Sequence, residues 1–413
     1  MDNRNPRPAV GGPWHPMPTT PVYMDNHATT RVDPRVVDAM LPYFTDRYGN
    51  AGSTSHAFGW AAKDAVDAAR TFVAAALNAS PREIVFTSGA TESNNLAIRG
   101  VCERARRRGQ HLISVVTEHR AVLDPFTKLA RRGFEVTHLS VRPHGTADAG
   151  TLDLDQLAAA IRDDTCLVSV MLANNEIGVL QPLAEIGRLC KQREVLLHTD
   201  ATQAVGKIPV DVEQLQVDLM SFTAHKIYGP KGMGALYVRS RNPQVRLESQ
   251  MDGGRQESGR RSGTLNVPGI VGFAEALRLC LEEMPAEQER LRQLRDRLFA
   301  GLGERVANVA LNGPALERTD LRLGGNLNCN FADVDGEALM LSMRDLAVSS
   351  GSACTSADPE PSHVLRALGL GDDLTRASLR FGLGRFNTAE EVEFAIQTVA
   401  DAVQRLRELR FPT

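Results

Sequence analysis

The chain has 413 residues, which suggests two domains, and its 42% hydrophobic and 23% charged residues are ordinary for a globular protein. The formal net charge of −3 excludes a strong attractive field for nucleic acid, so we expect no direct nucleic-acid binding. No apolar run reaches the roughly 18 residues of a membrane-spanning helix, so we expect no membrane attachment. Residues 1–21 are rich in proline and glycine and predict a disordered tail without a signal or transit sequence.

Short apolar segments alternate with helical patterns through the first two thirds of the chain. Strands are predicted at residues 83–87, 111–116, 167–171, 194–198, 217–222 and 232–238, and helices at 57–77, 92–108, 121–132, 154–162 and 182–193. This alternation predicts an α/β fold, with a mostly parallel sheet covered by helices on both faces.

The pattern changes after residue 268 and predicts a second, smaller α+β domain. Helical segments at 269–283 and 287–302 precede a strand at 326–331, and the glycine-rich stretch 318–325 is expected to be a surface loop. The predicted organisation is a tail (1–21), a segment joining the small domain (22–35), a large domain (36–267) and a small domain (268–413).

Six cysteines occur without a CxxC pair or a tight cluster, which favours reduced thiols in a cytoplasm and no intrinsic metal site. Five lie in apolar or helical surroundings and are expected to be core residues: Cys102, Cys166, Cys190, Cys280 and Cys329. Cys354 lies instead among small polar residues, in the sequence Ser-Ser-Gly-Ser-Ala-Cys-Thr-Ser. Such a setting suits an accessible, reactive thiol, although an incidental loop cysteine is the alternative.

Two residues that follow neighbouring strands indicate a cofactor. Asp200 closes one predicted strand and Lys226 follows the next. An acid and a lysine in these positions can bind pyridoxal phosphate, because the lysine forms a Schiff base with the cofactor and the acid pairs with the ring nitrogen. The alternatives are a helix cap for Asp200 and a surface charge for Lys226. Lys231 is a rival for the Schiff base, but it lies beyond a Gly-Pro turn.

Residues near this pair can serve the rest of such a cofactor. The chain turns on Gly89 after a strand and opens a helix near Thr91, where backbone N–H groups and the helix dipole favour a phosphate. An ordinary helix cap is the alternative. Thr223 and His225 can add phosphate donors, and Gln203 lies one turn beyond the aspartate, within reach of the ring hydroxyl.

Three further residues are candidates for work on the substrate. His119 follows a strand and is either a capping histidine or a ring that stacks on the cofactor and moves protons. Asn175 follows another strand, in a turn or in contact with cofactor or substrate. Arg380, in a predicted strand, is either a surface arginine or a bidentate partner for an amino-acid carboxylate.

Together these motifs resemble the NifS/IscS-type cysteine desulfurases, a branch of the class V pyridoxal-phosphate enzymes. The resemblance covers residues 22–410, and the matching stretches are 24–30, 88–93, 117–119, 174–178, 198–203, 225–232, 261–264 and 349–356. It implies a homodimer of fold type I subunits.

The resemblance also implies roles for single residues. Lys226 would carry the cofactor, Asp200 would pair with its ring nitrogen, Gln203 would meet its ring oxygen and His119 would stack on the ring. The residues implied to hold the phosphate are Ala90, Thr91, Thr223 and His225, with Thr264 reaching the phosphate of the partner subunit. Asn175 and Arg380 would bind the substrate carboxylate.

The implied reaction converts L-cysteine to L-alanine and leaves the sulfur on Cys354 as a persulfide. That sulfur would pass to acceptors such as an iron–sulfur scaffold protein or enzymes of tRNA thiolation, with Cys354 as a transient iron–sulfur ligand during transfer. A selenocysteine lyase would use the same residues, whereas an aminotransferase needs no such thiol. A sulfur carrier or scaffold partner without catalysis would not need Lys226, Asp200 and His119.

Overall fold

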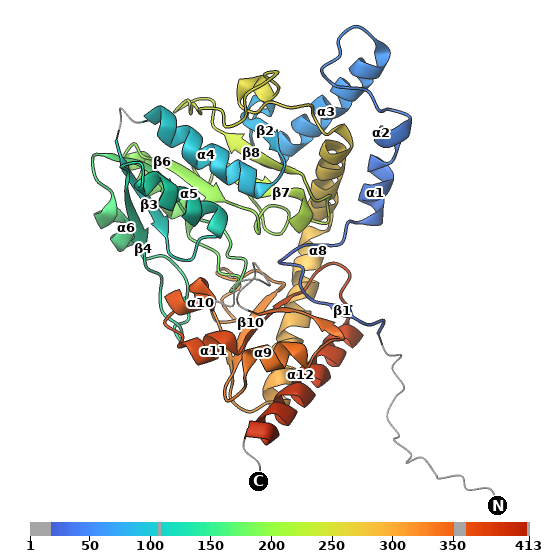
Figure 1. Ribbon diagram of the computed structural model, residues 1–413, viewed down its shortest axis with the longest axis vertical. Coiled ribbons are helices and arrows are strands. Elements are labelled where there is room, and N and C mark those ends of the chain that lie inside the picture. The colour runs from blue at the N-terminus through green and yellow to red at the C-terminus, as the bar shows by residue number, and fades with distance from the viewer. Residues whose placement is uncertain (1–17, 106–108, 351–360, 411–413) are drawn as a thin grey trace, which may run out of the picture.

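The computed structural model describes residues 18–105, 109–350 and 361–410 (Figure 1). Its larger part is a seven-stranded sheet. The strands follow the spatial order β2 (Ile84–Thr87), β8 (Gly234–Val238), β7 (Leu219–Thr223), β6 (Leu196–Asp200), β5 (Thr165–Ser169), β3 (His111–Val115) and β4 (Glu135–Leu139). β8 runs antiparallel to both of its neighbours, and the other paired strands are parallel. The predicted α/β fold with a mostly parallel sheet is therefore confirmed.

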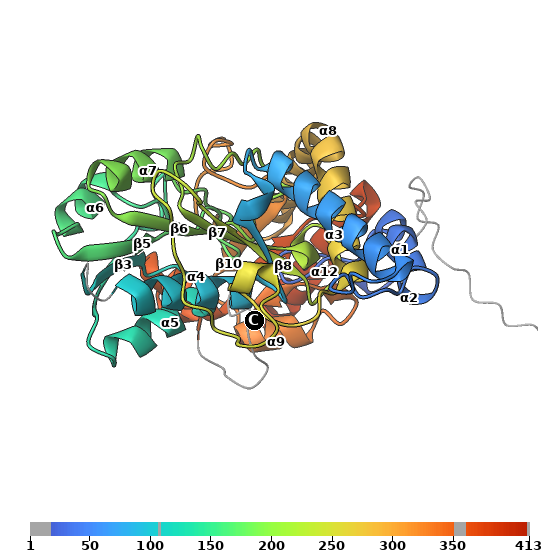
Figure 2. The same ribbon diagram turned by 90° about the horizontal axis from the view of Figure 1, so that it is seen from above.

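Helices cover both faces of this sheet, which explains why its strands read as continuous apolar runs. Ile84 and Phe86 point into one core and Val85 into the other, because successive side chains of a strand alternate. Figure 2 shows α4 (Ala90–Ala105) and α5 (Arg120–Ala130) on one face. The first core contains residues of α3 (Ala57–Ala76), α6 (Leu154–Ala160) and α7 (Leu183–Gln192).

A single long helix connects the two parts of the molecule. The helices predicted at 269–283 and 287–302 form one helix, α8 (Val267–Arg305), with Pro285 inside it. Phe273 belongs to the core of the large sheet, and Leu298 belongs to a second core. The predicted domain boundary near residue 268 thus falls at the start of a helix that serves both cores.

The second core packs around a four-stranded antiparallel sheet. Its strands follow the order β12 (Ser349–Ser350), β13 (Ser378–Gly382), β10 (Asn326–Phe331) and β9 (Val309–Leu311). The helices of this part are α9 (Gly336–Leu341), α10 (His363–Ala367), α11 (Asp372–Arg376) and α12 (Ala389–Arg410), the last packed against α8. Near the N-terminus, β1 (Val22–Tyr23) pairs with β11 (Leu346–Ala347), and Met24 enters the second core.

Short helices complete the described chain. They are α1 (Pro34–Met40), α2 (Pro42–Thr45) and the 3-10 turns η1 (Pro81–Glu83), η2 (Ala224–Lys226) and η3 (Glu257–Gly259). No helix within the described ranges combines the length and apolarity needed to cross a membrane.

The prediction of a surface loop at 318–325 is correct for its first half and wrong for its second. Thr319 and Asp320 are exposed, whereas Arg322 is 2% exposed. The guanidinium of Arg322 donates to the carbonyls of Pro314 at 2.8 Å and Asn312 at 2.5 Å, and these acceptors compensate for its burial. The five cysteines predicted to be core residues are confirmed as buried free thiols.

Candidate active site

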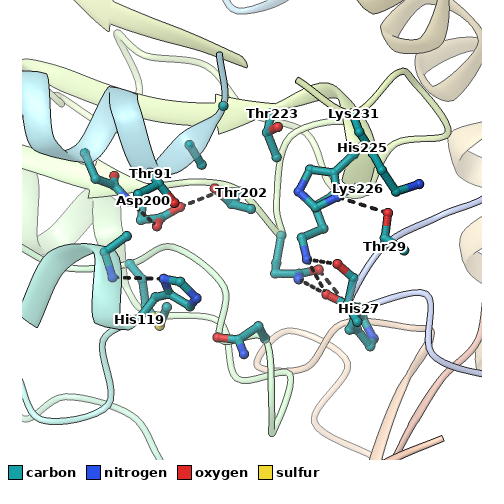
Figure 3. Close-up of a pocket in the computed structure, with 18 of the residues that line it drawn as sticks. His27, Thr29, Thr91, His119, Asp200, Thr202, Thr223, His225, Lys226 and Lys231 are labelled. Atoms are coloured by element: carbon teal, nitrogen blue, oxygen red, sulfur yellow. Dashed lines mark hydrogen bonds between the residues drawn. The ribbon is translucent and has the colours of Figure 1, made fainter. Parts of the chain in front are cut away.

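A cavity of about 510 Å³ lies beside the carboxyl ends of β6 and β7. Figure 3 shows it with Asp200 and His119 on one wall and Lys226 and His27 on the other. Its lining includes ten of the predicted site residues: Ala90, Thr91, His119, Asn175, Asp200, Gln203, Thr223, His225, Lys226 and Arg380. Thr264 is exposed and does not line the cavity, and Cys354 lies outside the described residues.

Asp200 is the last residue of β6, and its carboxylate is 4% exposed. The side-chain amide of Asn94, on α4, donates to Oδ2 at 2.7 Å, and the backbone N–H of Thr202 donates to Oδ1 at 3.0 Å. These two donors fix the carboxylate at the cavity wall. The sequence analysis did not identify Asn94, although its spacing of four residues from Ala90 places both on one helix face.

Lys226 ends the short turn η2, opposite this acid. Its Nζ donates to the backbone carbonyl of His27 at 2.6 Å and to that of Ala28 at 2.5 Å. The N-terminal segment therefore holds the amine in the cavity. His27 and Ala28 were not among the site residues predicted from the sequence. Lys226 is half-buried, whereas Lys231 also lines the cavity but is exposed.

The start of α4 provides the expected anion site. The first N–H groups of a helix have no intrahelical acceptor, and here they open on the cavity at Ala90 and Thr91. A Cβ on Gly234 would lie 2.6 Å from Cα of Gly89, so β8 packs tightly under the turn that positions these groups.

A salt bridge also steadies the first turn of α4. Burial opposes the charge of Glu92, but hydrogen bonds from Arg261 (2.8 Å) and from the backbone N–H of Ser88 (2.8 Å) lower the pKa of this carboxyl. The carboxylate thus ties the start of α4 to residues that precede α8.

His225 and Thr223, both expected to hold the phosphate, differ in the hydrogen bonds that their side chains already make. Burial, followed by the charges of Lys226 and Lys231, lowers the pKa of His225 to about 4, so its ring is neutral at neutral pH. Its Nδ1 lies 3.1 Å from the hydroxyl of Thr29. The hydroxyl of Thr223 donates to the carbonyl of Met233 at 2.7 Å, so it contacts an added anion as a donor only if that bond is released.

His119 both caps α5 and lines the cavity, so the two roles weighed from sequence are compatible. Its Nδ1 accepts the N–H of Ala121 at 3.0 Å. The proton of the neutral ring therefore lies on Nε2. Burial lowers the pKa of this imidazole, which keeps the neutral form at neutral pH.

Arg380 projects from β13 into the cavity wall and is 1% exposed. Its guanidinium donates to the carbonyl of Asn175 at 3.1 Å, to Asp25 at 2.7 Å and to the hydroxyl of Ser349 at 3.0 Å. Its Nε is buried without a hydrogen-bond partner among the described residues.

The profile described as aminotransferase class-V matches residues 22–394. The chain belongs to this family. It is 57% identical to the cysteine desulfurase IscS of Anaeromyxobacter sp. (strain K) over 389 residues, 94% of each chain. It is also 57% identical to the cysteine desulfurase IscS of Methylococcus capsulatus over 389 residues, again 94% of each. A solved NifS-like protein superposes with a TM-score of 0.85 at 37% identity, covering 93% of this chain and 100% of the other.

The family uses pyridoxal phosphate, and the cavity fits that cofactor. Asp200 offers an anion for the ring nitrogen, Lys226 an amine for the aldehyde, and the start of α4 unpaired N–H groups for the phosphate. The acid and the amine occupy opposite walls, so a flat ring has space between them. The protein is a pyridoxal-phosphate enzyme.

Proposed function

We propose that this protein is a cysteine desulfurase that converts L-cysteine to L-alanine and places the sulfur on Cys354. The observation that carries the proposal is that Asp200 and Lys226 face one cavity from opposite walls, with Arg380 at its edge. The relatives named cysteine desulfurase support the same reaction.

The bound cofactor supplies an electron sink for the bonds around the substrate α-carbon. The residues of the chain supply orientation and protons. Arg380 and Asn175, which both line the cavity, bind the substrate carboxylate. The amine of Lys226, once released, takes the α-proton, and His119 presents a proton on Nε2 from the opposite wall.

The sulfur step is balanced without an added oxidant or reductant. The thiolate of Cys354 attacks the substrate sulfur, so an S–S bond forms while the bond between sulfur and the β-carbon breaks. The electron pair of the broken bond stays on carbon, and a proton takes the place of the sulfur. The products are L-alanine and a persulfide on Cys354, from which sulfur passes to acceptors for iron–sulfur clusters or tRNA thiolation.

We further propose a cytoplasmic homodimer. Large apolar side chains gather on α2, on the start of α3 and on the segment between them, each more than half exposed: Leu41 (54%), Phe44 (59%), Tyr48 (64%), Phe58 (51%) and Trp60 (54%). An exposed patch of this kind is typical of an interface. A second copy would cover it, and Thr264, exposed away from its own cavity, is free to serve that copy. The five buried free thiols suit a reducing cytoplasm.

Absorbance and product analysis test the enzymatic proposal. The purified protein should become yellow with pyridoxal phosphate, and reduction with borohydride should place the pyridoxyl mass on the peptide of Lys226 rather than of Lys231. With L-cysteine it should form alanine. Cys354→Ala should keep the colour and lose turnover, and full activity in this variant would overturn the role of the thiol. Selenocysteine and amino acceptors should be compared as substrates, since transamination without sulfur release would favour an aminotransferase.

Sedimentation tests the homodimer. Phe44→Glu should shift the wild-type dimer to monomer, because a charge would be buried in the apolar patch. Leu409→Glu, at a site on α12 that is 74% exposed, is the matched control and should remain a dimer. A monomeric wild type, or a dimeric Phe44→Glu, would refute the assignment of this patch.

A further inference from the structure

Lys207 lies behind the cavity wall formed by Gln203, four residues further along the chain. Its Nζ donates to Oε1 of Gln203 at 2.5 Å, and its side chain is partly buried. No role for Lys207 follows from the motifs considered above. Its hydrogen bond goes to a residue that faces the cofactor cavity, which makes Lys207 a candidate for control of that residue.

The contacts of Gln203 fix which end of its amide faces which neighbour. An ammonium group only donates, so the side of the amide toward Lys207 must be the oxygen. A backbone carbonyl only accepts, so the side toward the carbonyl of His27, at 2.8 Å, must be Nε2. Nδ1 of His27 lies 3.0 Å from Oε1 and can donate to it in the tautomer that gives up the 3.3 Å contact between Nε2 and the carbonyl of Gly325. The second hydrogen on Nε2 is then the group that the amide retains for a ligand.

This remaining N–H lies beside the reactive amine. Nε2 of Gln203 and Nζ of Lys226 donate to the same carbonyl, that of His27, at 2.8 and 2.6 Å. In pyridoxal phosphate the ring oxygen is on the carbon next to the one that bears the aldehyde. The family resemblance assigns the side chain of Gln203 to that oxygen. An N–H donor stabilises its negative charge, whereas an amide oxygen would repel it.

Resting on the proposed function, we propose that Lys207 is a positioning residue that turns the amide N–H of Gln203 toward the ring oxygen of the cofactor. Lys207 also adds a positive charge close to the bond between Lys226 and the cofactor. Both effects favour loss of the proton on that linkage, because the first stabilises the oxygen anion left behind and the second repels the protonated form.

The surroundings of Lys207 determine its own charge. Burial, together with the charges of Lys226 and Arg380, lowers the pKa of Lys207 to about 7, although Cys280 and Glu287 on α8 oppose this shift. An anionic cofactor in the neighbouring cavity favours the charged, donor-only form. The holoenzyme is therefore the state in which the amide of Gln203 is most firmly oriented.

Titration of the visible absorbance of the holoenzyme measures the pKa of the linkage. In Lys207→Met, which loses donor and charge, the midpoint should rise by about one pH unit or more, the shift typical of a charge at close range. Lys207→Arg keeps a donor-only cation and should stay within a few tenths of a unit of wild type. Lys128→Met, at an exposed position on α5, is the matched control and should not shift.

A double-variant cycle separates positioning through Gln203 from a general structural effect. If Lys207 acts through the amide, Lys207→Met should shift the midpoint much less in a Gln203→Leu background than in wild type. An equal shift in both backgrounds, or a Lys207→Met midpoint equal to that of wild type, overturns the proposal. If Lys207→Met does not fold, as judged by thermal denaturation, Lys207→Gln is titrated instead with the same expected direction.

The outcome is distinguishable from failure of the proposed function. Alanine formation from L-cysteine by the wild type tests the enzyme itself. A wild type that turns over, with a Lys207 variant that titrates normally, overturns this inference alone. A wild type that binds the cofactor but forms no alanine overturns the proposed function and leaves the titration valid.

Discussion

Replacing Asp200 by asparagine should abolish most catalysis while leaving the fold intact. The new side chain keeps the shape of the old one, and its oxygen can still accept the N–H of Thr202, a contact of 3.0 Å in the structure. The new NH₂ would face the donor amide of Asn94, but Oδ1 of Asn94 is buried with no hydrogen-bond partner among the described residues. Rotation of that amide therefore restores the bond, and we expect a stability loss of about 1 kcal/mol or less.

The catalytic loss follows from the missing charge. An anion and a protonated ring nitrogen at hydrogen-bond distance, about 3 Å, interact by roughly 5 kcal/mol at an effective dielectric constant of about 20. Since each 1.36 kcal/mol corresponds to about a tenfold change in rate, kcat should fall by about three to four orders of magnitude. The change is specific to chemistry, because the phosphate and the lysine keep their contacts.

The assay combines alanine formation with a thermal melt and a cofactor titration. Asp401→Asn, at an exposed position on α12, is the matched control and should behave as wild type. If Asp200→Asn keeps a kcat within tenfold of wild type while remaining folded and loaded, the carboxylate is not the partner of the ring nitrogen and the reasoning fails.

Three further predictions concern stability, cofactor binding and substrate binding. Burial lowers the pKa of His198 to about 4, below the roughly 6.5 of an unfolded histidine, so stability present above pH 6.5 is lost as the pH falls toward 4. In urea unfolding of the apoprotein, the free energy of unfolding should fall between pH 6.5 and pH 4 by about 3 kcal/mol more for wild type than for His198→Gln. An equal fall in both proteins would show that His198 is not the source of this pH dependence. Gly234→Ala would place a Cβ 2.6 Å from Cα of Gly89, an overpacking that costs about 1–3 kcal/mol. The affinity for the cofactor should therefore fall roughly tenfold to a hundredfold. Gly371→Ala, at a position with open space around it, is the control and should leave this affinity unchanged. Arg380→Lys should raise the KM for cysteine by about tenfold to a hundredfold with a smaller change in kcat. The reason is that an ammonium group cannot replace a planar guanidinium that donates to several acceptors at once. An unchanged KM would exclude Arg380 as the partner of the substrate carboxylate.

The fold class and most elements could be predicted because the strands are apolar on both sides and the helices show a helical period. β4, at the sheet edge, was not predicted as a strand, because Glu135 and His138 interrupt its apolar character. The helical pattern over 269–283 and 287–302 is confirmed, and only the gap between the two stretches is absent. Packing against both cores keeps α8 continuous through Pro285.

The sequence by itself determined the chemical groups of the site, because an acid, a lysine and a helix start after successive strands must meet at one edge of a parallel sheet. Only the tertiary structure decided what holds those groups. The contacts of Asn94 with Asp200 and of the carbonyl of His27 with Lys226 join residues 106 and 199 positions apart in the chain. No local pattern encodes such pairs, since they depend on how the N-terminal segment and α4 close around the cavity.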